Sequence, residues 1–241
     1  MENQKPLTIE NRWDVLYRDY PEVYEEFGRF PYKPTLLTKL NHWFHLQKKH
    51  ILDVGSGTGL STFELASYAY RVTGLEPEPA MLDIAVQSSH TQGIKNVQFV
   101  CGRAEDIPLK DRSVELVTAI TLASLYTEEN IRAFVRQAER VVRKDGWIIL
   151  VDIAPGWYGG NLAPIILGKA RRVLPEEVIR DTILTEAGYQ HRDFYNLQDY
   201  GTVGHLIETY GFIFGKKVIQ YIHSNHTTMI KWKWRVHYKK I

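Results

Sequence analysis

Three glycines at alternate positions follow a short apolar run near residue 50. The run spans residues 51–54, the glycines are Gly55, Gly57 and Gly59, and residues 61–66 have the composition of a helix. This order predicts a strand, a tight turn and a helix N-terminus, the place where open α/β sheets bind nucleotides. Glycine suits such a turn because it adopts positive φ values and because its missing Cβ lets a ligand approach the backbone. The segment therefore indicates a site for a nucleoside-containing ligand.

The spacing of the glycines narrows the choice of ligand. The dinucleotide fingerprint G-x-G-x-x-G would need a glycine at position 60, which is Leu60, so a nicotinamide dehydrogenase is disfavoured. A P-loop would need Gly-Lys-Ser/Thr, but Leu60-Ser61 follows Gly59. Neither phosphate-binding motif fits, and the pattern that remains is Asp-x-Gly-x-Gly-x-Gly.

The segments after this turn alternate between strand and helix patterns. Residues 70–75 form a second apolar strand that leads to Glu76, about 20 residues beyond the first glycine. A carboxylate at that place can accept hydrogen bonds from both ribose hydroxyls. Pro77 and Pro79 favour the start of a helix directly afterwards. Further strands are predicted at 97–100, 114–120 and 147–153, with a helix over 128–142.

The Asp-x-Gly-x-Gly-x-Gly motif, Glu76 and this order of elements resemble the class I S-adenosylmethionine (SAM) methyltransferases. Among them the chain resembles the small-molecule enzymes related to the ubiquinone/menaquinone C-methylases, over roughly residues 45–155 and 197–222. The resemblance implies a Rossmann-like, seven-stranded α/β sheet with six parallel strands, an antiparallel last strand and helices on both faces. It also implies SAM as the cofactor and these cofactor-binding residues: Asp53, Gly55, Ser56, Gly57, Thr58, Gly59, Glu76, Pro77, Met81, Arg103, Ala104, Glu105 and Ile120.

The resemblance assigns these residues to parts of the cofactor. The glycine turn would surround the methionine moiety, Glu76 would hold the ribose, and Met81 would lie near the adenine. Arg103 stands where the family commonly has Asp or Asn. We therefore expect the exocyclic amine of adenine to bind Glu105 or the backbone instead.

The composition is typical of a globular chain. With 241 residues, 44% hydrophobic and 24% charged, the chain can form one large α/β domain over residues 1–241. A lone cysteine, Cys101, gives no internal disulfide, and the first residues lack the apolar stretch of a signal peptide. The longest apolar run, 147–153, is too short to span a membrane. These features favour a cytoplasmic protein and leave its oligomeric state open.

Two segments outside the cofactor half are predicted to cover the site. Residues 1–45 carry aromatic residues at helical intervals, which predicts a helical lid; Tyr17 and Tyr24 are candidates to face the sulfonium, since aromatic faces attract cations. Residues 154–196, which include Trp157, form an insertion after the fifth strand. Insertions there lie over the carboxyl ends of the strands, so we expect a substrate cap.

The tail is predicted to complete the sheet. Residues 212–222 resemble the sixth strand, and 228–238 an antiparallel seventh strand. The turn at 223–226 would then face the substrate pocket. The substrate-site candidates are Tyr17, Tyr24, Tyr126, Trp157, His223 and His226. No spacing identifies a catalytic base, and His42 and His45 have no third ligand in sequence, so we expect no metal.

The predicted reaction is transfer of a methyl group from SAM to a nucleophilic atom of a small molecule by in-line displacement. One alternative is an RNA or protein methyltransferase that uses the basic C-terminal strand, although 120–123 lacks the Asn/Asp-Pro-Pro-aromatic motif of nucleic-acid amino-methylases. Another is a non-catalytic SAM-binding subunit, which would be expected to lose the glycines or Glu76. Both alternatives remain open, but the small-molecule interpretation is favoured because an insertion and a hairpin can enclose a pocket.

Overall fold

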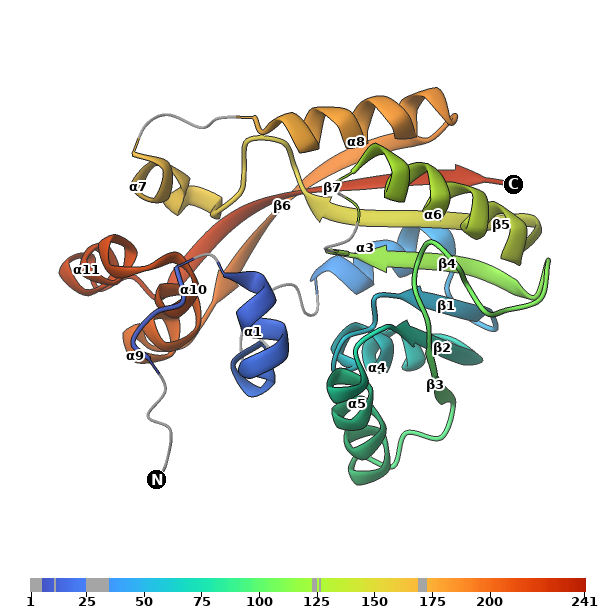
Figure 1. Cartoon of the computed structure of the whole chain (residues 1–241), viewed down its shortest axis with the longest axis horizontal. Coiled ribbons are helices and arrows are strands. Elements are labelled where there is room, and N and C mark those ends of the chain that lie inside the picture. Colours follow the sequence, from blue (N-terminus) through green and yellow to red (C-terminus); the bar gives the residue numbers. More distant parts are fainter. Residues whose placement is uncertain (1–5, 11, 25–34, 123–124, 126, 169–172) are drawn as a thin grey trace.

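The computed structural model describes residues 6–10, 12–24, 35–122, 125, 127–168 and 173–241. Seven strands form one sheet in the order β3-β2-β1-β4-β5-β7-β6 (Figure 1). The strands are β1 (His50–Val54), β2 (Arg71–Glu76), β3 (Val97–Cys101), β4 (Val114–Ile120), β5 (Val142–Ile153), β6 (Gln190–Asp199) and β7 (Met229–Lys240). The helices are α1 (Trp13–Asp19), α3 (Thr35–Phe44), α4 (Leu60–Ala66), α5 (Pro79–Thr91), α6 (Glu128–Val141), α7 (Ala163–Leu167), α8 (Pro175–Glu186), α9 (Val203–Leu206), α10 (Phe212–Phe214) and α11 (Lys216–Asn225).

The pairing of the strands confirms the predicted sheet. β1 pairs in parallel with β2 and β4, β2 with β3, and β4 with β5. β7 is antiparallel to both β5 and β6, so β6 runs in the same direction as the other five. Because β1 lies in the middle of the parallel part, the turn after it opens at the carboxyl edge of the sheet, where open α/β folds bind ligands.

Helices cover the sheet on both faces, as its buried parallel strands require. Along β5, Ile148 and Leu150 belong to the core that α6 and α8 cover. The alternate residues Ile149 and Val151 belong to the core that α3 and α4 cover. Because successive side chains of a strand point to opposite faces, β5 is apolar on both sides. Separately, no helix in the described part of the chain is long and apolar enough to cross a membrane.

The sixth strand differs from its predicted position. Residues 212–222, predicted as a strand, lie in α10 and α11, and β6 is formed by Gln190–Asp199 instead. Val218 and Ile222, four positions apart, are both fully buried, which is the spacing of a helix that packs on a core. The prediction of a hairpin turn at 223–226 is therefore wrong: these residues belong to the last turn and C-cap of α11.

A helical cover lies beyond the ends at which β4 and β5 finish, and it is built from α1, α7 and α9–α11 (Figure 1). The N-terminal segment joins it through a hydrogen bond of 2.9 Å from Ile9 N to the carbonyl of Phe212. Trp13 Nε1 also donates to the hydroxyl of Tyr158 over 3.0 Å. Within the predicted cap range 154–196, α8 and β6 belong to the sheet and its flanking layer. The helices α9–α11, outside that range, take their place in the cover.

A charged layer lies between α8 and the last strands of the sheet. Arg235 on β7 is opposite Asp152 on β5 and Asp193 on β6. It donates to both oxygens of Asp193 over 2.8 and 3.0 Å and forms an ion pair with Asp181 on α8. His237, two residues further along β7, is 2% exposed, and its Nε2 lies 3.1 Å from Asp181. The layer therefore links α8 to β6 and β7 electrostatically.

We expect this layer to make the fold less stable in acid. Burial by itself raises the pKa of Asp193, but hydrogen bonds from Arg235 and Lys233 outweigh it and lower the pKa to about 2. A carboxyl with a lowered folded pKa stabilises the fold above its unfolded pKa, and that stability is lost as the pH falls from about 4 toward 2. Burial lowers the pKa of His237 below 6.5, so protonation of the unfolded chain also reduces stability below that pH.

Urea unfolding at pH 7, 5.5, 4 and 3 measures this effect. Asp193→Asn is expected to lower the unfolding free energy at pH 7 by about 1 to 2 kcal/mol, because solvent screens a partly buried pair, and to flatten the decline below pH 4. The exposed Asp83→Asn is the matched control and should follow the wild-type curve. An equal decline in wild type and Asp193→Asn would show that the layer does not couple stability to pH.

Candidate functional site

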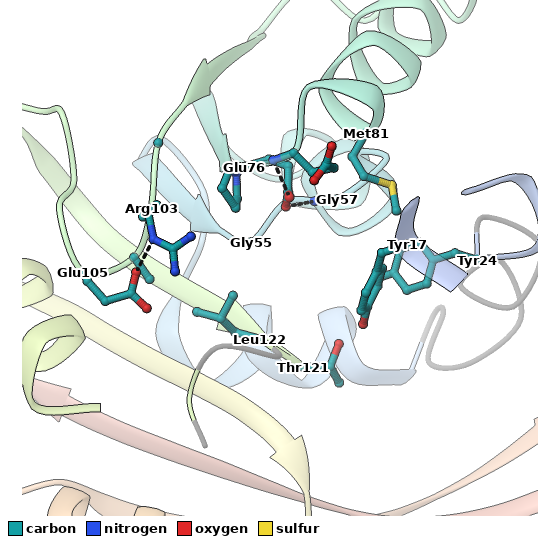
Figure 2. Close-up of a pocket in the computed structure, with 14 residues that line it drawn as sticks. Tyr17, Tyr24, Gly55, Gly57, Glu76, Met81, Arg103, Glu105, Thr121 and Leu122 are labelled. Atoms are coloured by element: carbon teal, nitrogen blue, oxygen red, sulfur yellow. Dashed lines mark hydrogen bonds and ion pairs between the residues drawn. The ribbon is translucent and has the colours of Figure 1, made fainter. Parts of the chain in front are cut away.

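A pocket of about 260 Å³ opens where β1, β2, β3 and β4 end (Figure 2). Its walls come from four successive strand ends and from the N-terminal segment, so residues far apart in sequence meet there. The lining residues are Tyr17, Tyr24, Gly55, Gly57, Glu76, Pro77, Glu78, Met81, Gly102, Arg103, Ala104, Glu105, Thr121 and Leu122.

The glycine turn forms the floor of the pocket. Gly55, Gly57 and Gly59 have φ values of 74°, 54° and 91°, in the region that residues with a side chain rarely adopt. A Cβ at Gly55 would overlap the side chain of Leu122, and one at Gly57 would lie 3.3 Å from Cε1 of Tyr24. The turn therefore requires glycine both for its conformation and for the close approach of other groups to its backbone.

Glu76 joins the turn to the start of α5. It is the last residue of β2 and is 9% exposed. Oε2 accepts a hydrogen bond from Gly57 N over 3.0 Å, and Oε1 accepts one from Glu78 N over 3.1 Å (Figure 2). Burial raises the pKa of this carboxyl, and the two backbone donors act against that rise. Each carboxylate oxygen can accept a second hydrogen bond, so the pair suits a diol in the pocket.

Asp53 supports the turn from below and does not line the pocket. It is 1% exposed, and its carboxylate accepts hydrogen bonds from Thr62 over 2.7 Å, Ser61 over 3.0 Å and Thr118 over 2.9 Å. These hydroxyls belong to α4 and β4, so Asp53 holds the first turn of α4 against the sheet. Burial raises the pKa of the carboxyl, with the three hydroxyl donors opposing that rise.

Asp53→Ala is expected to destabilise the fold, because it removes the acceptor of Ser61 and Thr62 and leaves Thr118 only its longer bond of 3.3 Å to the carbonyl of Leu52. Buried groups that lose a charged partner cost about 1 to 3 kcal/mol each, and we expect a loss of about 3 kcal/mol in total. For a chain of this size the melting temperature should fall by about 6 to 12 °C. Thermal unfolding checks this, with the exposed Asp83→Ala as control. A melting temperature like that of wild type would contradict this role.

The loop after β3 lines one side of the pocket. Arg103 and Glu105 form an ion pair, with 3.3 Å between Arg103 Nε and Glu105 Oε2 (Figure 2). The Arg103 side chain is 64% exposed, whereas that of Glu105 is 18% exposed. Ala104 is buried between them. This side of the pocket therefore carries one exposed cation and one shielded carboxylate.

The other side of the pocket is formed by the end of β4 and the N-terminal segment. The rings of Tyr17 and Tyr24 meet edge to face, with 4.8 Å between centroids. Thr121 has a φ of 52°, which is strained for a β-branched residue, and its N–H donates to the carbonyl of Val151 on β5 over 2.8 Å. Figure 2 shows the hydroxyl of Tyr17 pointing toward that of Thr121. Strain of this kind is concentrated at functional sites.

The structure places eight of the implied cofactor residues in the pocket wall and five behind it. Those in the wall are Gly55, Gly57, Glu76, Pro77, Met81, Arg103, Ala104 and Glu105, and those behind it are Asp53, Ser56, Thr58, Gly59 and Ile120. Sequence reasoning missed four lining residues: Glu78, Gly102, Thr121 and Leu122. Gly102, Thr121 and Leu122 lie within two positions of the end of a predicted strand, and Glu78 lies three positions beyond one. Nearness to a strand end is the signal that identifies them.

Only some of the predicted substrate-site residues line the pocket. Tyr17 and Tyr24 line the pocket. Trp157 packs instead against Tyr195 on β6, with 5.3 Å between ring centroids. His223 and His226 are exposed at the end of α11 and do not line the pocket, because the predicted hairpin is a helix. Tyr126 lies outside the described residues.

Comparison with known proteins finds that the part of the chain with the first four strands is similar to methyltransferases. Residues 51–146 match a protein family described as "Methyltransferase domain". The chain is 30% identical over 102 residues to an uncharacterized methyltransferase, YcgJ, of Bacillus subtilis, across 42% of this chain and 40% of that protein. It is 30% identical over 128 residues to a demethylmenaquinone methyltransferase of Tropheryma whipplei, across 53% of this chain and 50% of that protein. The matched region spans about half the length of these relatives or less.

Solved structures extend the similarity to nearly the whole fold. The crystal structure of YcgJ from Bacillus subtilis superimposes with a TM-score of 0.57 at 18% identity, over 90% of this chain and 98% of that one. A methyltransferase structure from an antibiotic biosynthesis pathway of Anabaena variabilis gives a TM-score of 0.60 at 18% identity, over 89% and 99%. At such identities the likeness concerns the fold alone.

Proposed function

We propose that this chain is a class I SAM-dependent methyltransferase, in line with the match of residues 51–146 to a methyltransferase domain, and that it transfers a methyl group from SAM to a nucleophilic atom of a small molecule. The observation that carries this proposal is the convergence of Gly57 and Glu76, which a hydrogen bond of 3.0 Å joins at one wall of the pocket. The turn offers backbone without side chains, and the carboxylate offers acceptors for a ribose diol. The residues present therefore fit the cofactor of the family.

In this proposal the cofactor lies across the four strand ends. Gly55 and Gly57 contact its methionine moiety, and Glu76 holds the ribose. Met81, Ala104 and the side chains beside Ala104 surround the base. SAM supplies a methyl group already activated by a positively charged sulfur, so the chain has to align the two reactants and exclude water.

The acceptor is proposed to enter beside Thr121. With Gly57 and Glu76 holding the cofactor, the methyl group would be presented to the part of the pocket at the end of β4 that Tyr17, Tyr24 and Leu122 also line. The two tyrosine rings provide aromatic edges and faces next to the sulfonium, a setting that favours a cation. Of the predicted lid range 1–45 and cap range 154–196, α1 and α7 act as lid and cap in this proposal, together with α9–α11. No residue is assigned as catalytic base.

The ion pairs of the C-terminal strand favour a small molecule over RNA or an acidic protein. The basic residues of β7 that suggested a polyanion site are mostly neutralised within the chain. Lys233 pairs with Asp193, Lys239 with Glu139 and Lys240 with Asp145. Arg235 pairs with Asp193 and Asp181, and Lys231 lies 4.7 Å over the ring of Tyr195. Such a strand offers little free charge for the phosphate contacts that RNA binding requires. Because a lone cysteine forms no internal disulfide, we also propose that the protein is cytoplasmic.

Methyl transfer with labelled SAM tests the proposal. The purified full chain is first titrated with SAM and with S-adenosylhomocysteine (SAH) by calorimetry. It is then incubated with labelled SAM and either a panel of small phenols, thiols, amines and carboxylates or total RNA. Binding of SAM with label recovered in a small molecule is the expected result. Label in RNA alone would favour the second candidate, and no binding of SAM would reject both.

A further inference from the structure

The edge of the sheet at which the parallel strands begin is strongly basic, although the chain as a whole has a net charge of only +2. This edge lies opposite the pocket: in Figure 1 the arrows of β4 and β5 point toward α1, and that of β7 points away from it. The loops 45–49, 67–70 and 92–96, which lead into β1, β2 and β3, contain no acidic residue. Within the described part of the chain, the cations at this edge that form no ion pair include Lys48, Lys49, Arg71, Lys95, Arg112 and Lys144.

Contacts between the strand starts join these cations into one row. The N–H groups of Tyr70 and Arg71 donate to the carbonyl of Lys49 over 3.0 and 3.3 Å, so the cations of β1 and β2 are neighbours. Arg143 on β5 donates to the carbonyl of Arg112, two residues before β4, over 3.3 Å. Because β3, β2, β1, β4 and β5 are adjacent in the sheet, the row follows its edge across five strands.

The length of the row matches a short single strand of nucleic acid. Neighbouring strands of a sheet lie about 4.8 Å apart, so five strand starts extend over about 19 Å. A stacked strand of nucleic acid carries one phosphate about every 3.4 Å, and the row can therefore contact about five phosphates. Like charges in a row repel one another, and a polyanion that neutralises them is attracted. A single line of cations follows one backbone, whereas an anionic membrane would require a basic plane.

An exposed aromatic ring lies within the row. Tyr70 directly precedes β2 and is 74% exposed. Bases of any type stack on such rings, and basic residues beside an aromatic ring are typical of surfaces that bind single strands. No other large apolar side chain in the described loops of this edge is exposed, so the surface lacks the apolar residues with which a protein enters a membrane. An acidic peptide would leave the exposed ring without a role.

We propose that this edge of the sheet binds a single strand of nucleic acid, with the cations on its phosphates and Tyr70 stacked on one base. The inference is independent of the proposed methyl transfer, because a strand held at this edge does not reach the pocket at the opposite edge. It also differs from the RNA methyltransferase alternative, in which the basic strand β7 would hold the methyl acceptor. The bound strand is a partner that the protein holds and not the group that it methylates.

Fluorescence anisotropy with labelled decauridylate tests the row of cations. The full chain is titrated at salt concentrations from about 50 to about 200 mM, and contact with about five phosphates gives a slope of about −3.5 in log K against log salt. The triple variant Lys48→Gln, Lys95→Gln, Lys144→Gln removes three of these contacts, so its slope should be about −1.5. The matched control is Lys217→Gln, an exposed lysine on α11, which should keep the wild-type slope. A wild-type slope shallower than about −1, or an unchanged slope in the triple variant, would overturn the proposal.

Tyr70→Ala tests the stacking separately. It should weaken the binding of decauridylate by about fivefold to a hundredfold without changing the slope, because no charge is lost. Tyr221→Ala, which removes an exposed tyrosine on α11, is the control and should bind like wild type. Equal affinity in Tyr70→Ala and wild type would overturn the assignment, and so would binding of poly-L-glutamate or phosphatidylserine vesicles as tight as that of decauridylate. Titration with SAM tests the methyltransferase proposal independently, and thermal unfolding confirms that each variant is folded.

Discussion

Glu76→Ala is expected to weaken SAM binding by at least about a hundredfold. The variant loses the acceptors proposed for the two ribose hydroxyls, and hydrogen bonds to a carboxylate contribute about 1.5 to 3 kcal/mol each. It also frees Gly57 N and Glu78 N, which the carboxylate holds at 3.0 and 3.1 Å. The glycine turn and the start of α5 therefore lose their common partner. Isothermal titration with SAM measures the loss.

Two further substitutions show whether the effect belongs to the carboxylate. Glu76→Gln keeps one oxygen acceptor and should lie between wild type and Glu76→Ala. Glu129→Ala removes an exposed glutamate on the first turn of α6, far from the pocket wall, and should leave SAM affinity unchanged. An affinity of Glu76→Ala within about threefold of wild type would contradict the ribose assignment.

Gly57→Val is expected to abolish measurable SAM binding. At a φ of 54° a β-branched residue is strained, and its side chain would extend from a Cβ only 3.3 Å from the ring of Tyr24. The added carbons would fill the part of the pocket through which a ligand approaches the backbone. Since the turn lies at the surface of the pocket and not in the core, the rest of the fold should survive.

Gly93→Val provides a matched control for strain. Gly93 has a similar φ of 66°, and a Cβ there meets nothing within 4 Å. It follows α5 and does not line the pocket, so its variant should lose some stability but bind SAM like wild type. Equal SAM affinity in Gly57→Val and wild type, together with a normal Glu76→Ala, would refute the cofactor site as a whole.

The cofactor half of the fold was predictable because its signals are local. Each strand from β1 to β5 contains a short apolar run, and glycine or proline follows β1, β2, β3 and β5 within a few residues and marks the turn. After β4 no such residue comes before Glu128. Glu76 and the glycine turn belong to one strand–helix–strand unit, so their meeting follows from the right-handed connection between parallel strands. The tail has weaker signals. Val218 and Ile222 are compatible with either a strand or a helix until burial is known, and the strand was therefore placed at 212–222 instead of at Gln190–Asp199.

Site residues that depend on distant packing could be predicted only in part. The sequence places Asp53 in the motif but does not tell whether its carboxylate faces a ligand or the hydroxyls of Ser61, Thr62 and Thr118. It gives no sign that Thr121 adopts a positive φ, because that conformation depends on its bond to Val151 on the neighbouring strand. Tyr17 was a candidate from helical spacing, but its position at the pocket depends on the packing of the N-terminal segment against α10.

That packing has a consequence for the order in which the protein is made. Ile9 bonds to Phe212, about 200 residues later in the chain. At a synthesis rate of about 5 to 20 residues per second, the segment that contains Ile9 is made some 10 to 40 seconds before the segment that contains Phe212. The nascent chain can therefore form the strands around the glycine turn while the entrance above them is still open. We therefore expect the newly made protein to bind its cofactor before the helical cover is complete. The pocket is covered only after α9–α11 have been synthesised.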